Sequence, residues 1–162
     1  MKIENEIKKI CIVIPEGLPV PAVKGGAIET LVQQIIDYNE IYKKFQFTIL
    51  TVRDQEAEKL YGQYHLSKFV QFNKGDRNCF LRKIEIFLRG IRKYTKIPLH
   101  IKSSYMKSIE KYLLSSHEQF DYIINESCDF YGFRKISKKF GRSKVWAHAH
   151  CYVRADWYID SM

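Results

Sequence analysis

Short apolar segments alternate with amphipathic segments along most of this chain, and that alternation restricts the fold more than any other feature. The first apolar segment, Lys9–Ile14 (KICIVI), is almost continuous in apolar residues, which is typical of a parallel strand covered on both faces. Pro15, Pro19 and Pro21 end it, because proline supplies no ladder donor. The next segment, Ala27–Tyr42, has the apolar spacing of an amphipathic helix.

The alternation of strand and helix segments continues towards the carboxyl end of the chain. Further strands are predicted over Phe47–Val52, Lys68–Phe72, Phe120–Asn125 and Lys144–His148, and helices over Cys79–Lys93, Ser103–Ser116 and Phe130–Phe140, with a charged helical turn at Gln55–Leu60. This alternation predicts the α/β class, with a Rossmann-like, doubly wound and mainly parallel sheet. The length of 162 residues suits one domain. Ligands of such sheets bind at the carboxyl ends of the strands.

The connection from the first strand to the first helix, Pro15–Gly26, exceeds the roughly 2 to 6 residues that usually join such elements. Gly25 and Gly26 directly precede the helix, where the backbone can approach a ligand and free N–H groups favour negative charge. Lys24 adds a cation. The connection lacks the glycine pattern of dinucleotide binders and of P-loops, so a plain turn is the alternative. Glu29 lies in the first helical turn, where the helix dipole stabilises a carboxylate. That structural role is enough to explain an acidic residue at this position.

Polar residues follow the two last predicted strands. Glu126 lies in the run Asn125–Asp129, which could accept hydrogen bonds from sugar hydroxyls, although Asp129 could simply cap the next helix. His148 and His150 alternate with Ala149, so on a strand both would point to one face. A contact with substrate is the favoured interpretation of these histidines, and a buried structural role and metal binding are the alternatives. No third ligand accompanies them at a convincing spacing, so neither a metal nor another cofactor is expected.

The net charge of +9 and the pI near 9.3 indicate an anionic partner. Seven basic residues and one acidic residue fall within 77–96. The apolar stripe and basic flank of this segment predict a helix that faces an anionic membrane through Arg82, Lys83, Arg89 and Arg92. A core-facing helix with a solvated basic side is the alternative. Nucleic acid is not expected as a partner, because no helix-turn-helix, RNA-recognition or zinc signature is present.

The rest of the composition indicates a cytoplasmic protein. The first ten residues are polar and charged, and the apolar run Ile10–Ile14 is too short for a signal segment or a membrane span. The four cysteines show no paired spacing, which favours idle thiols over disulfides or a zinc site.

Two motifs carry a family resemblance. The run PVPAVKGGAIETLV after the first strand resembles the N-terminal signature of retaining, GT-B-fold glycosyltransferases of family four, especially bacterial enzymes of capsule and surface polysaccharide synthesis. The stretch KVWAHAH, one helix after FDYIINES, is similar to a later strand of that family, which ends in a histidine. The resemblance implies half of a GT-B fold. It also implies transfer of a hexosyl group from a nucleotide-sugar to a saccharide or lipid-linked acceptor, without a metal, at the inner membrane face.

The resemblance also implies roles for individual residues. Gly25 and Gly26 would lie over the interdomain cleft, and His150, or as the alternative His148, would contact the transferred sugar as the catalytic residue. The substrate-binding set that follows is Lys24, Gly25, Gly26, Glu29, Glu126 and His148. Cys151 and Tyr152 follow His150 where the family commonly has asparagine or acidic residues, which keeps His148 as the alternative.

The donor-binding second domain of GT-B enzymes has no counterpart in residues 1–162. We therefore expect these residues to form a single N-terminal, acceptor-side domain that requires a C-terminal domain and is inactive alone. A non-catalytic binding or partner module with the same fold is the alternative from a different functional class.

Overall fold

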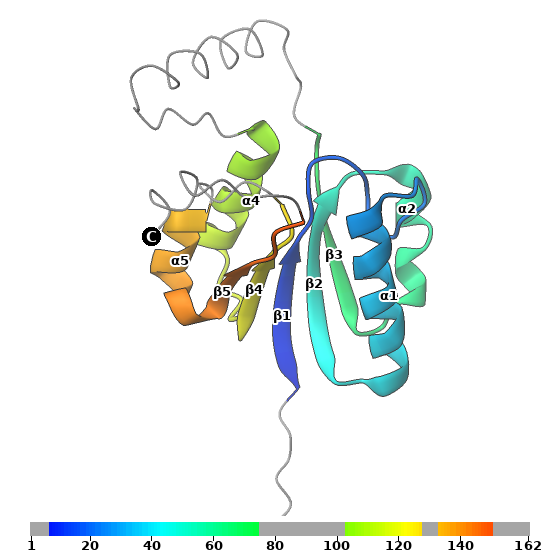
Figure 1. The fold of residues 1–162 in the computed structure, drawn as a ribbon, viewed down its shortest axis with the longest axis horizontal. Coiled ribbons are helices and arrows are strands. Elements are labelled where there is room, and N and C mark those ends of the chain that lie inside the picture. Colours follow the sequence, from blue (N-terminus) through cyan, green and yellow to red (C-terminus); the bar gives the residue numbers. More distant parts are fainter. Residues whose placement is uncertain (1–6, 75–102, 128–132, 151–162) are drawn as a thin grey trace, which may run out of the picture.

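A computed structural model of the chain describes residues 7–74, 103–127 and 133–150. Its centre is one sheet with the strand order β3-β2-β1-β4-β5, in which every neighbouring pair is parallel (Figure 1). The strands are β1 (Lys8–Val13), β2 (Phe45–Val52), β3 (Ser67–Phe72), β4 (Tyr122–Asn125) and β5 (Val145–Ala147). The predicted Rossmann-like α/β sheet is confirmed.

Helices cover both faces of this sheet. The helices are α1 (Ala27–Tyr42), α2 (Gln55–Glu58), α4 (Ser104–Ser115) and α5 (Arg134–Phe140), and two 3-10 turns are η1 (Tyr61–Gln63) and η3 (Arg142–Lys144). Helix α1 lies on one side of the sheet, and α4 and α5 lie on the other (Figure 1). The predicted bounds of α1 are confirmed at both ends. Ser103 caps α4, because its hydroxyl accepts a hydrogen bond from Met106 N at 3.2 Å.

Strand β1 is apolar without interruption because it is buried on both faces. Cys11 and Val13 belong to the core cluster that includes α4 and α5, whereas Ile10 and Ile12 belong to the cluster that includes α1. Successive side chains of a strand point to opposite faces, so both faces of β1 need apolar residues. Cys11 is a fully buried free thiol, and burial raises its pKa, which is the idle role predicted for it. The other three cysteines lie outside the described residues.

Several predicted boundaries are wrong. The last strand was expected to end at His148, but β5 ends at Ala147, and the turn η3 occupies its expected first residue. Both histidines therefore follow the strand, although His148 N still donates to Asn125 O at 2.9 Å and extends the ladder by one bond. Strand β4 begins at Tyr122, two residues later than predicted. The predicted helix over 79–93, with Arg82, Lys83, Arg89 and Arg92, lies outside the described residues.

Candidate functional site

Side chains of the sheet and of α1 hold the long connection between β1 and α1 in place. Val20 N donates to Thr51 Oγ1 at 3.0 Å, and Ala22 N donates to Gln33 Oε1 at 2.8 Å. The Val20 side chain is fully buried in the core cluster beneath α1. These contacts hold the connection in place at the carboxyl edge of the sheet, where ligands of parallel sheets bind.

The backbone conformation at the end of this connection requires two glycines. Gly25 and Gly26 have φ angles of 75° and 99°, in the region that glycine adopts readily and other residues seldom do. Gly26 is also the N-cap of α1, and no side chain caps the helix there. The partial positive charge of the first helical turn is met by the buried carboxylate of Glu29, which lies over Gly26.

Glu29 is buried in the first turn of α1, with 5% of its surface exposed. Its carboxylate lies over Gly26, at the position that a Cβ atom of residue 26 would take. The N-terminus of a helix stabilises a carboxylate. Glu29 therefore stabilises the start of α1 whether or not it also contacts a ligand.

Lys24 forms an ion pair with Asp54 at the outer end of the connection. Asp54 also caps α2, accepting hydrogen bonds from Glu56 N at 3.0 Å and Ala57 N at 3.3 Å. The hydrogen bond to Lys24 lowers the pKa of Asp54, and the same bond raises the pKa of Lys24. A bound phosphate would have to compete with Asp54 for this ammonium group, which the sequence suggested as a cation of the site.

Three residues predicted for the site meet at the ends of β4 and β5. Glu126 Oε2 lies 3.1 Å from His148 Nδ1 and also contacts His150 Nε2. The two imidazole rings are 4.3 Å apart between centroids and tilted by 47°. The Glu126 side chain is 6% exposed, His150 is 19% exposed and His148 is 56% exposed. A buried carboxylate thus has two imidazole partners, as burial of a charge requires.

The turn that aims Glu126 is built by its neighbours. Asn125 Oδ1 accepts hydrogen bonds from Ser127 N at 2.9 Å and from Ser127 Oγ at 2.6 Å. Both residues are buried, so their interaction shapes the backbone on either side of Glu126. An asparagine two residues before a serine at a strand end is a known turn signal, and the sequence interpretation treated both residues as sugar acceptors instead.

A groove joins the start of α1 to the segment after β5. The groove is shallow and open to solvent, with a volume of about 620 Å³. Its lining residues are Gly26, Ala27, Ile28, Thr30, Leu31, Gln34 and His150. The structure therefore brings Gly26 and His150 to one surface from opposite ends of the chain. The other residues predicted for the site, Lys24, Gly25, Glu29, Glu126 and His148, are not among these lining residues, although Glu126 contacts His150.

A second hollow, of about 290 Å³, lies at the opposite edge of the sheet. Lys9, Phe47 and Ser67, which begin or nearly begin their strands, are among its lining residues. Parallel sheets bind ligands at their carboxyl edge. We therefore assign the candidate site to the groove between Gly26 and His150.

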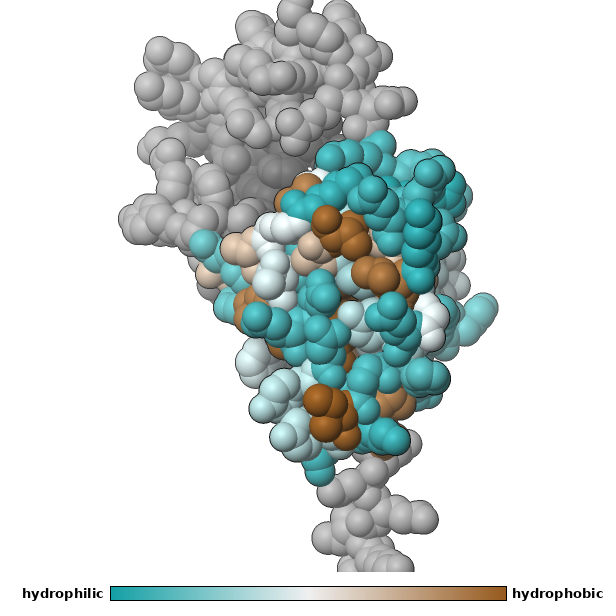
Figure 2. All heavy atoms as spheres, turned by 90° about the vertical axis from the view of Figure 1, so that its right-hand side faces the viewer, coloured by the Kyte–Doolittle hydropathy of each residue, from teal (hydrophilic) through white to brown (hydrophobic). Residues whose placement is uncertain are grey.

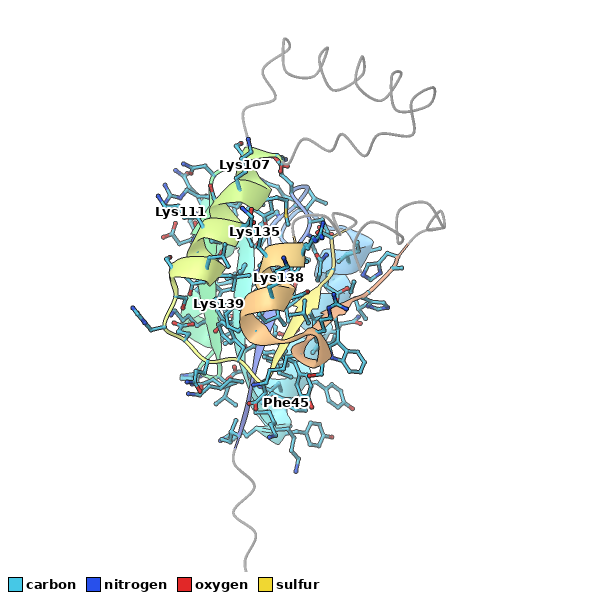
Figure 3. The ribbon with its side chains drawn as sticks, turned by 90° about the vertical axis from the view of Figure 1, so that its left-hand side faces the viewer. Phe45, Lys107, Lys111, Lys135, Lys138 and Lys139 are labelled. Atoms are coloured by element: carbon cyan, nitrogen blue, oxygen red, sulfur yellow. The ribbon has the colours of Figure 1, made fainter. Side chains whose placement is uncertain are left out.

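The outer sides of α4 and α5 carry lysines that the sequence interpretation did not single out. Figure 3 shows this basic surface, made of Lys107 and Lys111 on α4 and of Lys135, Lys138 and Lys139 on α5. Two of these lysines already have partners. Lys135 Nζ lies 3.7 Å from Glu110 Oε1, and Lys139 Nζ donates to backbone carbonyls at the end of α4. The spacing of the lysines in RKISKKF was the sequence feature that could have predicted this basic surface.

No family model, no curated protein and no solved structure matches this chain. The resemblance to family-four glycosyltransferases thus depends on the two sequence motifs alone. The geometry of the groove is a separate observation.

Proposed function

We propose that this chain is the acceptor-side domain of a retaining glycosyltransferase. The complete enzyme would transfer a hexosyl group from a nucleotide-sugar to a saccharide or lipid-linked acceptor in bacterial surface polysaccharide synthesis. One observation carries the proposal: Gly26, from the PVPAVKGGAIETLV run, and His150, from the KVWAHAH run, line the same groove. The two motifs that suggested the family are 124 positions apart in sequence, yet they form one surface at the ligand-binding edge of the sheet.

The groove offers two kinds of contact to such a substrate. The helix start at Gly26 offers backbone N–H groups, which a ligand would have to share with the Glu29 carboxylate that lies over Gly26. His150 contacts Glu126 through Nε2, and its Nδ1 is the ring atom left for a sugar hydroxyl. The hydrogen bond to Glu126 fixes the orientation of that ring, which pre-organises the contact.

The proposed division of labour places the leaving diphosphate on another domain. Stabilisation of developing charge is usually the largest contribution to such catalysis, so this chain alone would not transfer sugar. Calorimetric titration with UDP-glucose and GDP-mannose tests this division. We expect no binding below millimolar concentration for either donor, and a micromolar Kd for one of them would contradict the division.

The proposed location is the cytoplasmic face of an anionic membrane, where the domain docks peripherally. None of the helices in the described ranges has both the length and the apolar character that crossing a bilayer requires. The basic surface of α4 and α5 offers Lys107, Lys111 and Lys138 to lipid phosphates, and each lysine contributes about 1 kcal/mol near an anionic surface. It adds to the predicted contribution of Arg82, Lys83, Arg89 and Arg92.

Vesicle sedimentation tests this location. With vesicles of phosphatidylglycerol and phosphatidylcholine, we expect binding that falls at least tenfold in the variant K107E/K111E/K138E. The same loss is expected for R82E/K83E/R89E/R92E. The matched control K43E/K44E/K59E carries the same charge change as the first variant on exposed residues elsewhere, and it should retain more binding. Equal losses in the control and in the α4–α5 variant would show that only net charge matters and would contradict a docking surface.

A non-catalytic partner module is the second candidate, and the outer side of α1 favours it. Leu31, Ile35, Tyr38 and Tyr42 recur at helical spacing and are 38%, 41%, 65% and 56% exposed. Figure 2 shows apolar side chains between hydrophilic ones on the face of the molecule that carries α1 and α2. If this stripe binds a protein partner, Ile35→Ser and Tyr38→Ser will abolish the association and leave saccharide binding in the groove unchanged.

A further inference from the structure

We propose that Glu126, His148 and His150 form a binding site for one Zn²⁺ ion. One ligand atom from each of these residues lies within 4.8 Å of the other two. Two imidazole nitrogens with one carboxylate oxygen are a ligand set of catalytic zinc sites, and imidazole ligands select transition metals over Mg²⁺ and Ca²⁺. The inference goes beyond the proposed function and departs from the expectation of a metal-free chain.

One of the separations between the ligand atoms already fits a zinc ion. Bonds of about 2.0–2.1 Å in a tetrahedral site place neighbouring ligand atoms roughly 3.3 Å apart. Glu126 Oε2 and His148 Nδ1 are 3.1 Å apart, so this pair already has nearly the required spacing. His150 Nε2 is in closer contact with the same carboxylate oxygen, so that ring would have to move away from Glu126 for the ion to enter.

The backbone holds two of the three ligands in fixed positions. Glu126 N donates to Val13 O at 3.0 Å, and His148 N donates to Asn125 O at 2.9 Å. Both residues therefore belong to the hydrogen-bonding pattern at the carboxyl edge of the sheet. A site whose ligands are fixed before binding loses less conformational entropy when the ion binds.

Charge also favours a cation at this place. The Glu126 side chain is 6% exposed, and a buried carboxylate needs a compensating positive charge or strong hydrogen bonds. Within the described residues its ion-pair partners are the two histidines. A divalent ion between the three side chains would neutralise the carboxylate directly and leave both imidazoles uncharged.

Three protein ligands leave one position of a tetrahedral ion for water or for an oxygen of a ligand. His150 lines the groove that begins at Gly26, so the ion would lie beside that groove. It would add positive charge at the edge of the sheet where α1 begins.

Calorimetric titration of the chelator-treated full chain with ZnCl₂ tests the site. We expect one Zn²⁺ per chain with a micromolar or tighter Kd, and MgCl₂ should bind at least tenfold more weakly. His150→Gln and Glu126→Gln should each weaken Zn²⁺ binding at least tenfold. The matched control is His65→Gln, because His65 forms a surface pair with Glu40 at 3.7 Å and is 83% exposed; its titration should be unchanged.

Two further measurements keep the test decisive. Because Glu126 is buried, Glu126→Gln could unfold the chain, so the exposed His148→Gln serves as the second ligand variant. With Co²⁺ in place of Zn²⁺, we expect visible bands of a nitrogen and oxygen site without a near-ultraviolet thiolate band. The proposal is overturned by a thiolate band, by zinc affinity that is unchanged in both histidine variants, or by the absence of micromolar zinc binding. Saccharide binding measured in metal-free buffer tests the proposed function separately.

Discussion

A Cβ atom at Gly26 would occupy the place of the Glu29 carboxylate, three residues further along the same helix. The same atom would lie 2.8 Å from Leu18 Cδ1. Both contacts are with the ends of side chains that can shift, so the φ of 99° is the stronger reason for a glycine at this position. The glycine of the candidate groove is required by the backbone conformation at the helix start, where the Glu29 carboxylate lies over it.

Gly26→Ala should lower the free energy of unfolding by about 2 kcal/mol, because it adds both steric overlap and backbone strain. Urea unfolding measures this change. Gly17→Ala is the matched control, since a Cβ there meets nothing within 4 Å, and its effect should stay within about 0.5 kcal/mol. In the double variant G26A/E29A, the part of the loss that comes from overlap with the carboxylate should be recovered. A double variant as unstable as the sum of the single variants would contradict the contact.

The start of the loop depends on Tyr105 of α4. Its hydroxyl donates to Ile14 O at 2.9 Å and lies 3.4 Å from Leu50 O. Tyr105→Phe removes a buried hydrogen bond to Ile14 O, which should lower the free energy of unfolding by about 1 to 2 kcal/mol at neutral pH. Tyr38→Phe is the control, because Tyr38 is 65% exposed, and it should change stability by less than about 0.5 kcal/mol.

The same tyrosine makes stability depend on alkaline pH. Burial, assisted by the negative charges of Glu16 and Glu29, raises the pKa of Tyr105 above its ordinary value of about 10. Because the folded pKa exceeds the unfolded pKa, the contribution to stability is complete below about pH 10 and is lost as the pH rises further. Urea unfolding between pH 7 and 11 should therefore show a steeper decline for the parent chain than for Y105F. Parallel curves would contradict the assignment.

Lys139, on the neighbouring helix α5, caps the carboxyl end of α4. Its ammonium group donates to the carbonyls of Leu113 at 3.0 Å, Leu114 at 2.9 Å and Ser116 at 2.8 Å. A cation at the carboxyl end of a helix satisfies unpaired carbonyls and the helix dipole. Lys139→Met should lower the free energy of unfolding, measured by thermal unfolding, by about 1 kcal/mol. Lys138 is exposed, so Lys138→Met should leave the free energy of unfolding nearly unchanged. Equal effects would mean that only the loss of charge matters.

The sequence predicted the sheet well for a physical reason. Continuous apolar strands such as β1 and an amphipathic helix such as α1 carry strong periodic signals, and the bounds of α1 were predicted correctly. The end of β5 was not, because Ala147 and His148 have no feature that separates the last ladder residue from the first loop residue. Boundaries are the weakest part of a pattern-based prediction.

The candidate site was predicted in part. The rule that ligands bind at the carboxyl ends of strands placed Gly26, Glu126 and His150 at one edge, and the structure brings them near one another. Contacts between side chains carry no sequence spacing, so the pairing of Lys24 with Asp54 and the carboxylate shared by His148 and His150 were not predicted. Glu126 can act as a third ligand only because strands β4 and β5 are neighbours in the sheet. The spacing of residues in the sequence does not give the order of the strands.

The central claim is that the groove between Gly26 and His150 binds a saccharide. A titration of the ¹⁵N-labelled chain with octyl glycosides of glucose, galactose and N-acetylglucosamine, followed by amide chemical shifts in metal-free buffer, tests it most directly. We expect shifts at Gly26, Thr30 and His150 for at least one glycoside, and their loss in His150→Gln. Shifts confined to residues outside the groove, or none with any of the three glycosides, would contradict it.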